Sequence, residues 1–168
     1  DFVMFPIKVD DEVANQSAAL WRQPRSAVTE EQHTEFFKHI TQSRLGDSPL
    51  TYVHYQVDAP VQFSSLLYVP QKAPVDVFQL QKKRPGLRLY AKRVLIMENC
   101  DTLLPVYLRF VRGVVDSEDL QLNVSRETLQ ENRTVKQIEQ QLTRQVLKGL
   151  SKLAENDTEK YDAFWKEL

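Results

Sequence analysis

LRFVRGVVDSEDLQLNVSRETLQ, residues 108–130, is the stretch around which this chain is organised. Ser125 is a candidate helix N-cap, which puts Arg126 in the first helical turn and Gln130 four residues later on the same face. A cation is normally disfavoured at the positive end of a helix dipole, whereas an anion is attracted there. Arg126 is therefore best explained if its guanidinium and the open backbone N–H groups share an anionic ligand such as a phosphate.

Strand patterns lie upstream of this stretch. Residues 5–9 form a short apolar segment, residues 51–57 alternate between the two faces of a strand, and residues 63–69 continue in the same way until Pro70. Residues 87–97 predict a further strand. Its last four residues, VLIM, are apolar without interruption, and this indicates a central place in the sheet.

Helical spacing of apolar residues predicts four helices, at residues 29–40, 105–112, 135–153 and 161–165. A capping box of Thr29 and Gln32 opens the first helix. Gly113 ends the second, and Val114 and Val115 then form a buried connector. Strands flanked by helices predict an α/β fold, an αβα layered sandwich from which the last two helices trail as a possible appendage.

The composition is that of one soluble domain. The chain has 168 residues, of which 42% are hydrophobic and 27% charged, so it can build a core. A formal net charge of −1 argues against a nucleic-acid binder, which needs a basic surplus. No apolar run approaches the roughly 20 residues that cross a bilayer. The first residues also show no signal-peptide pattern, and we therefore expect a chain without a membrane span.

Nucleophilic and metal chemistry find little support in the sequence. Cys100 is the only cysteine, so the chain can form no internal disulfide, and a reducing compartment fits best. His33 and His39 are six residues apart, which is not the spacing of a helical metal site, and nothing pairs Cys100 with either of them or with His54. We therefore predict no metal site and treat all three histidines as structural.

Several separated motifs together resemble the middle domain of the heat shock protein 90 family, the ATP-driven chaperones. They are ALWRQP, TEEQHTEFFKHI, SLLYVPQKAP, LYAKRVLIM, YLRFVRGVVDSEDL and LNVSRE, in the family's order from about Phe5 to the last residues. Any one of these motifs would be weak evidence, but together they cover nearly the whole chain.

The resemblance implies a domain plan. Residues 1–132 would form the large αβα middle subdomain, with a catalytic loop near 116–130, and residues 133–168 the start of a helical coil that leads to a smaller subdomain. The parent would be a homodimer with its own N-terminal nucleotide-binding domain and C-terminal dimerisation domain. ATP with magnesium would be bound mainly by the N-terminal domain, and we expect none bound to this fragment alone.

Two interpretations of Arg126 stay open from the residues alone: an ion pair with Glu118, Asp119 or Glu127 that orders the loop, or contact with an anion. The resemblance favours the second. It implies that Arg126 contacts the γ-phosphate of ATP in the N-terminal domain and that Gln130 supports the same end of the nucleotide.

Other residues of the chain are assigned only by the resemblance. Asn123 is a further candidate for the γ-phosphate contact. The general base and the magnesium ligands would lie outside this chain, so the fragment by itself would not be an enzyme.

Two apolar residues also receive roles from the resemblance. Trp21 would contact client proteins from an exposed position, although an indole beside a proline-containing loop is more often a core residue. Leu95 occupies a position where the family often has phenylalanine and would dock on the N-terminal domain. Gln121 replaces the proline usual before LNVSRE, which removes a fixed φ and loosens the loop.

We therefore read the chain as part of an ATP-dependent chaperone that binds unfolded or partly folded clients, with cochaperones as possible partners. The resemblance places its parent in the bacterial cytoplasm, with the mitochondrial matrix as the alternative. A non-catalytic module that binds clients or cochaperones is the first rival function. An unrelated small-molecule enzyme is the second, and it would need a deep polar pocket that no motif predicts.

Overall fold

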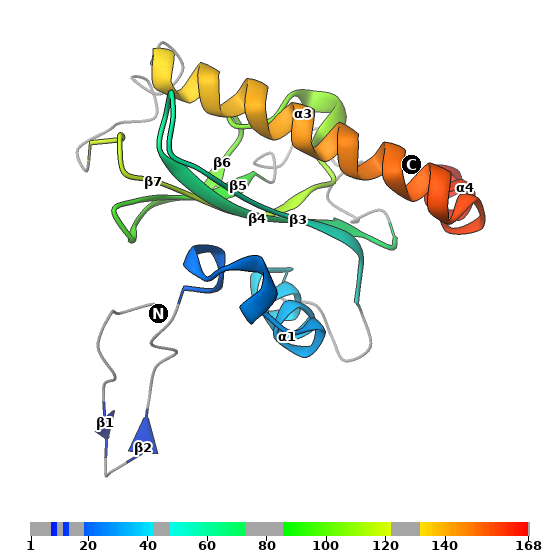
Figure 1. Ribbon diagram of the computed structural model, residues 1–168, viewed down its shortest axis with the longest axis horizontal. Helices are drawn as coiled ribbons and strands as arrows, with labels where there is room; N and C mark the ends of the chain where they lie inside the picture. Colours follow the sequence, from blue (N-terminus) through cyan, green and yellow to red (C-terminus); the bar gives the residue numbers. More distant parts are fainter. Residues whose placement is uncertain are drawn as a thin grey trace.

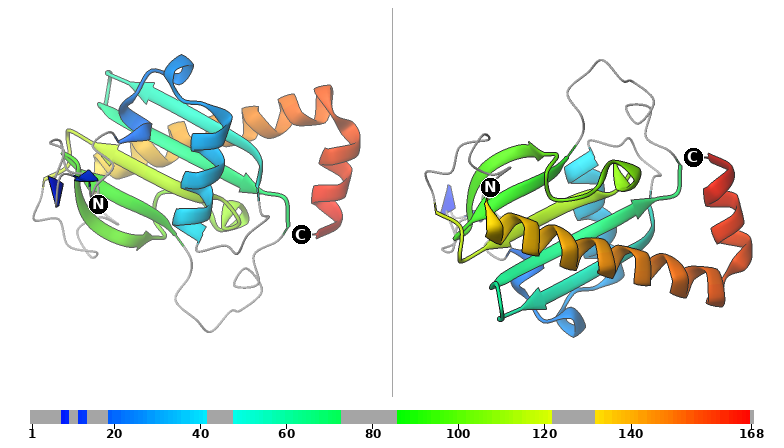
Figure 2. Two further views of the ribbon diagram at one scale, coloured as in Figure 1. Left: turned by 90° about the horizontal axis from the view of Figure 1, so that it is seen from below. Right: turned by 90° about the horizontal axis from the view of Figure 1, so that it is seen from above.

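The computed structural model describes residues 8–9, 12–13, 19–41, 48–72, 86–121 and 132–167, and it has three layers (Figure 1). A five-stranded sheet lies in the middle, α1 covers one face and α3 covers the other (Figure 2). The predicted α/β sandwich is thus confirmed. Outside this sheet, β1 (Lys8–Val9) pairs with β2 (Glu12–Val13), so the strand predicted at residues 5–9 is observed at its last two positions.

The strands of the sheet lie in the order β3-β4-β7-β5-β6. They are β3 (Pro49–Val57), β4 (Phe63–Pro70), β5 (Leu87–Ala91), β6 (Val94–Cys100) and β7 (Arg112–Ser117). All neighbouring pairs are antiparallel except β5 and β7, which run parallel. The order leaves β3 and β6 as the two edges of the sheet.

The sheet corrects two predictions. Residues 87–97 are not one central strand but the hairpin β5–β6, and β6 lies at the edge with Val94 and Leu95 exposed. Residues 105–112 form only a short 3₁₀ turn, η4 (Val106–Leu108), and the residues expected to be a connector belong to β7 in the interior of the sheet. The misleading signal was Gly113, which reads as a helix stop but lies inside a strand.

Gly113 is required where it stands. Its φ is 153°, and a Cβ at this position would lie 2.3 Å from the carbonyl oxygen of Leu66 on the neighbouring strand. A non-glycine residue would therefore force β7 away from β4.

The helices begin and end near their predicted positions. Two short turns, η1 (Leu20–Arg22) and η2 (Arg25–Ala27), lead to α1 (Glu30–Thr41), and the chain ends with α3 (Arg133–Asn156) and α4 (Thr158–Glu167). The capping box is confirmed, because the backbone N–H of Thr29 donates to Gln32 Oε1 at 2.9 Å and that of Gln32 donates to Thr29 Oγ1 at 3.3 Å. No helix among the described residues is both long and apolar enough to span a membrane.

Each face of the sheet has its own apolar core, because side chains alternate along the strands. On β4, Leu67 and Val69 face α3, whereas Leu66 and Tyr68 face α1. Five residues of α3 are buried against the first face: Val135, Ile138, Leu142, Val146 and Leu150. α3 is therefore a full layer of the sandwich rather than an appendage, while the division of the chain at residue 132 stays a prediction.

Candidate functional site at the end of strand β7

The segment assigned to catalysis follows directly after β7. Three residues predicted to contact ATP, Asn123, Arg126 and Gln130, lie in residues 122–131, which are outside the described part of the chain. The structure does describe how this segment is held at its start, from Asp116 to Gln121, and where it ends, at Asn132. The side chain of Asn132 caps α3 by accepting the backbone N–H of Thr134 at 2.8 Å.

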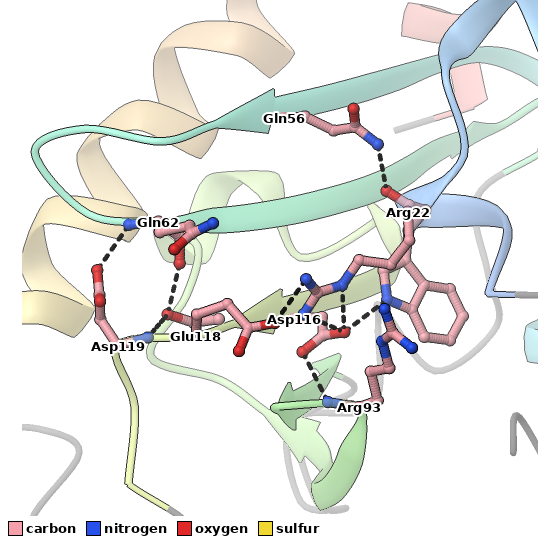
Figure 3. Close-up of polar contacts among 9 residues, drawn as sticks. Arg22, Gln56, Gln62, Arg93, Asp116, Glu118 and Asp119 are labelled. Atoms are coloured by element: carbon pink, nitrogen blue, oxygen red, sulfur yellow. Dashed lines mark hydrogen bonds and ion pairs between the residues drawn. The ribbon is translucent and has the colours of Figure 1, made fainter. Parts of the chain in front are cut away.

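A buried carboxylate fixes the end of β7 (Figure 3). Asp116 is 0% exposed, and its Oδ2 accepts hydrogen bonds from Trp21 Nε1 at 2.9 Å and Arg22 Nε at 2.8 Å. Its Oδ1 accepts the backbone N–H of Arg93 at 3.1 Å. These donors come from the η1 turn and from the β5–β6 hairpin, so one carboxylate joins three separate parts of the chain. A buried charge is tolerated when it is paired and hydrogen-bonded in this way.

Arg22 extends the network toward the segment that carries Arg126. Its Nη2 lies 2.8 Å from Asp116 Oδ2, and its Nη1 lies 2.6 Å from Glu118 Oε1. Glu118 is the first residue after β7. The guanidinium therefore bridges the last part of the strand and the first residue of the segment that carries Arg126. Removing Arg22 would leave the buried charge of Asp116 without its cation.

A second set of hydrogen bonds holds the same turn to the β3–β4 connection. The backbone N–H of Glu118 and the hydroxyl of Ser117 both donate to the carbonyl oxygen of Gln62, at 3.1 and 3.0 Å. The carboxylate of Asp119 in turn accepts the backbone N–H of Gln62 at 2.6 Å. Glu118 and Asp119, which could have paired with Arg126, thus both have partners in the fold.

The tip of the β5–β6 hairpin lies beside this turn. Lys92 and Arg93 have φ values of 49° and 68°, the left-handed conformation of a tight hairpin turn. Non-glycine residues rarely adopt it, but here the backbone N–H of Lys92 donates to Ser117 O at 3.2 Å and that of Arg93 to Asp116. The fold therefore presents two cations next to the start of the segment that carries Arg126.

Leu95 lies on the same hairpin, three residues from Lys92. It is 42% exposed, and its neighbour Val94 is 52% exposed. The two residues are consecutive in β6 and therefore point to opposite faces, so each is a single exposed apolar side chain near the two cations. The predicted role of Leu95 at the interface with the N-terminal domain needs such exposure and stays a prediction.

Trp21 is buried, whereas a residue that contacts client proteins has to be exposed. It is 0% exposed, and its ring packs against Tyr90 and Phe36, with centroid distances of 5.0 and 5.8 Å. Because its Nε1 donates to Asp116, the indole is satisfied inside the core. The expectation of an exposed Trp21 is corrected accordingly, and the interpretation as a core residue is the one that the structure supports.

Sequence reasoning missed the residues that hold the site, Asp116, Arg22 and Arg93. One signal was available: Asp116 follows the apolar pair Val114-Val115, and an acid next to a buried run is expected to need a partner. Its partners are 94 and 23 residues away, and no local pattern identifies them. No group of three or more His, Cys, Asp or Glu among the described residues could hold a metal ion.

Comparison with known proteins agrees with this architecture. A family model described as "Hsp90 protein" matches residues 6–168. Chaperone protein HtpG of Nitratidesulfovibrio vulgaris is 49% identical over 166 residues, which cover 99% of this chain and 26% of the relative. HtpG of Paraburkholderia xenovorans is 49% identical over 165 residues, which cover 96% of this chain and 26% of the relative. This chain thus spans about a quarter of the length of these curated relatives.

A solved structure is also similar. The middle domain of a Plasmodium falciparum heat shock protein matches with a TM-score of 0.76 and 27% sequence identity, covering 89% of this chain and 56% of that one. The three-layer fold, the order of the motifs and these matches agree with one another. The chain belongs to the Hsp90 protein family and has the fold of its middle domain.

Proposed function

We propose that this domain completes the ATPase site of a chaperone by supplying Arg126 to the γ-phosphate of ATP bound in a preceding nucleotide-binding domain. Phosphoryl transfer depends on charge stabilisation and positioning more than on a protein nucleophile. Arginine provides a permanently charged, planar group that can bind two phosphate oxygens at once. Gln130 supports the same end of the nucleotide, and Asn123 is a further candidate for the γ-phosphate contact.

The observation that carries the proposal is the way in which the Arg126 segment is held at its start. A charged residue that acts on a ligand bound in another domain needs a rigid attachment to its own domain. A misplacement of about 1 Å already costs much of the catalytic effect. Here the attachment consists of the buried carboxylate of Asp116 with its donors Trp21 and Arg22, and the ion pair of Arg22 with Glu118 reinforces it. Family membership supports the same reading of the LNVSRE motif.

The hairpin tip supports a docking surface for the nucleotide-binding domain. Ala91 of β5 pairs with Ser117 of β7, so the tip of the hairpin and the start of the catalytic segment lie at the same end of the sheet. We propose that Leu95 and Val94 contact the nucleotide-binding domain when the two domains meet. Leucine instead of phenylalanine reduces the apolar area of this contact without removing it.

The remaining parts of the function belong to the parent protein. ATP and magnesium would be held mainly by the N-terminal domain, so this chain alone would not hydrolyse ATP. The parent would act as a homodimer on unfolded or partly folded clients in the bacterial cytoplasm, and the HtpG relatives named above are bacterial chaperones. Trp21, being buried, is not proposed as a direct client contact.

The proposal is tested by combining the two domains. The nucleotide-binding domain is titrated with a non-hydrolysable ATP analogue alone, with this chain, and with its Arg126→Ala variant. We expect the chain to strengthen analogue binding or to restore hydrolysis of ATP, and the variant to lose this effect while keeping its fold. If chain and variant act alike, the segment is structural and the domain is a client- or cochaperone-binding module.

A further inference from the structure

A basic groove runs along the open edge of the sheet, on the side away from the β5–β6 hairpin. Its volume is about 440 Å³, and it is lined by residues 51–55 of β3, by α3 residues between Gln145 and Asn156, and by Arg25 of η2. The two helical layers thus contribute its rims, and the edge strand forms its floor. Figure 2 shows α3 crossing the sheet above this strand.

The floor of the groove is an edge strand. β3 is the first strand in the sheet order and pairs only with β4 among the described strands. In an edge strand, alternate residues direct their N–H and C=O groups away from the sheet, and these groups can accept a further strand. Residues 51–55 span about 17 Å at roughly 3.3 Å per residue, so a five-residue extended segment fits this length.

The α3 side of the groove lies close to β3 because Gly149 of α3 has no side chain. Gly149 of α3 faces Val53, and a Cβ at this position would lie 3.2 Å from Val53 Cγ2. The helix therefore covers the α3 face of β3 while its lysines stand at the open edge.

Positive charge is concentrated on the rims. Arg25, Lys148 and Lys152 all line the groove and are exposed, and none forms an ion pair within the described part of the chain. No Asp or Glu among the described residues lines the groove. Glu30 lies beside the groove, where its Oε1 accepts the hydroxyl of Tyr52 at 2.9 Å, and Glu155 of α3 is exposed next to the lining residue Asn156. Three exposed cations beside an edge strand favour an anionic occupant.

We propose that this groove binds an extended acidic peptide segment, which adds to the edge of β3 as a further strand. The backbone groups of β3 would pair with the peptide backbone, and acidic side chains of the peptide would reach Lys148 and Lys152 on one side and Arg25 on the other. Peptide binding in this groove needs neither ATP nor Arg126.

Binding is tested with a labelled peptide of sequence EVETEVE and with KVKTKVK as its matched control, using fluorescence anisotropy on this chain. We expect EVETEVE to bind and KVKTKVK not to bind. Lys152→Glu should weaken binding about tenfold, equivalent to about 1.4 kcal/mol, because it replaces an attraction by a repulsion. Lys136→Glu changes the charge of α3 by the same amount at an exposed position outside the groove, and binding should stay within about twofold.

The strand addition is tested by amide hydrogen exchange with and without EVETEVE. Alternate amides within residues 51–55 should become protected. Equal weakening by Lys152→Glu and Lys136→Glu would overturn the site, and so would the absence of binding. Competition by inorganic tripolyphosphate without protection of β3 amides would show a simple anion site and overturn the strand addition. Loss of ATPase activity in Arg126→Ala leaves these outcomes unaffected, so the two proposals fail separately.

Discussion

Replacing Trp21 by alanine should lower the free energy of unfolding of this domain by about 3–5 kcal/mol, the usual cost of truncating a large buried aromatic side chain. Trp21 is 0% exposed and lies between Tyr90 and Phe36. The same change removes one of the donors to Asp116, at 2.9 Å, and a hydrogen bond to a buried charged group contributes about 1–3 kcal/mol. The two effects share one site and overlap, so we do not expect their full sum.

A matched variant separates packing from hydrogen bonding. Trp21→Phe keeps most of the aromatic volume but has no donor for Asp116, so it should cost about 1–3 kcal/mol. Urea unfolding of this chain followed by far-UV circular dichroism measures all three proteins. A Trp21→Ala variant within about 0.5 kcal/mol of the parent would behave as a surface substitution and would refute the buried position.

Three further outcomes are expected, two from the described residues and one from the proposed two-domain mechanism. Gly113→Ala should destabilise the domain by about 2–4 kcal/mol, because its Cβ would meet the Leu66 carbonyl. Gly149→Ala should change the free energy of unfolding by less than about 1 kcal/mol, because only a side-chain methyl is close. Urea unfolding of the two variants compares these costs. Burial lowers the pKa of His33 and of His54 below the ordinary 6.5. As the pH falls, these two histidines therefore bind protons at a higher pH in the unfolded chain than in the folded one. Stability should therefore be full above about pH 6.5 and fall as the pH drops, and a double histidine-to-glutamine variant should show a flatter dependence of the urea midpoint on pH. The isolated chain should show no ATP hydrolysis and only very weak ATP binding by calorimetry, and tight stoichiometric binding would contradict the two-domain mechanism.

Local patterns predicted those parts of the fold whose causes are local. The helix from Glu30 and its capping box depend on residues within four positions of one another, and both were predicted from that spacing. The alternation at 51–57 likewise identified β3. The place of Val94 and Leu95 at an exposed edge could not be predicted from their apolar character, because the order of strands is set by long-range pairing.

The candidate site likewise has parts that local patterns predict and parts that depend on long-range contacts. The prediction of a site at Arg126 and Gln130 rests on the motif and on the unfavourable position of a cation in a first helical turn, and both residues lie outside the described part of the chain. The sequence did not identify Asp116 as the group that holds this segment, because the donors Trp21 and Arg22 are more than 90 residues away. It also allowed an exposed Trp21, since an indole beside a loop is compatible with both the core and the surface.

The steady-state ATPase rate of an Arg126→Ala variant of the full-length parent tests the central claim most directly. We expect kcat at saturating ATP to fall by roughly 10²-fold or more, while nucleotide affinity changes little, because the arginine would act on the charge that develops during transfer. Arg126→Lys keeps the charge without the planar fork and should be intermediate. Arg133→Ala, at an exposed position on α3, serves as the control. An unchanged kcat in a correctly folded Arg126→Ala variant would contradict the account.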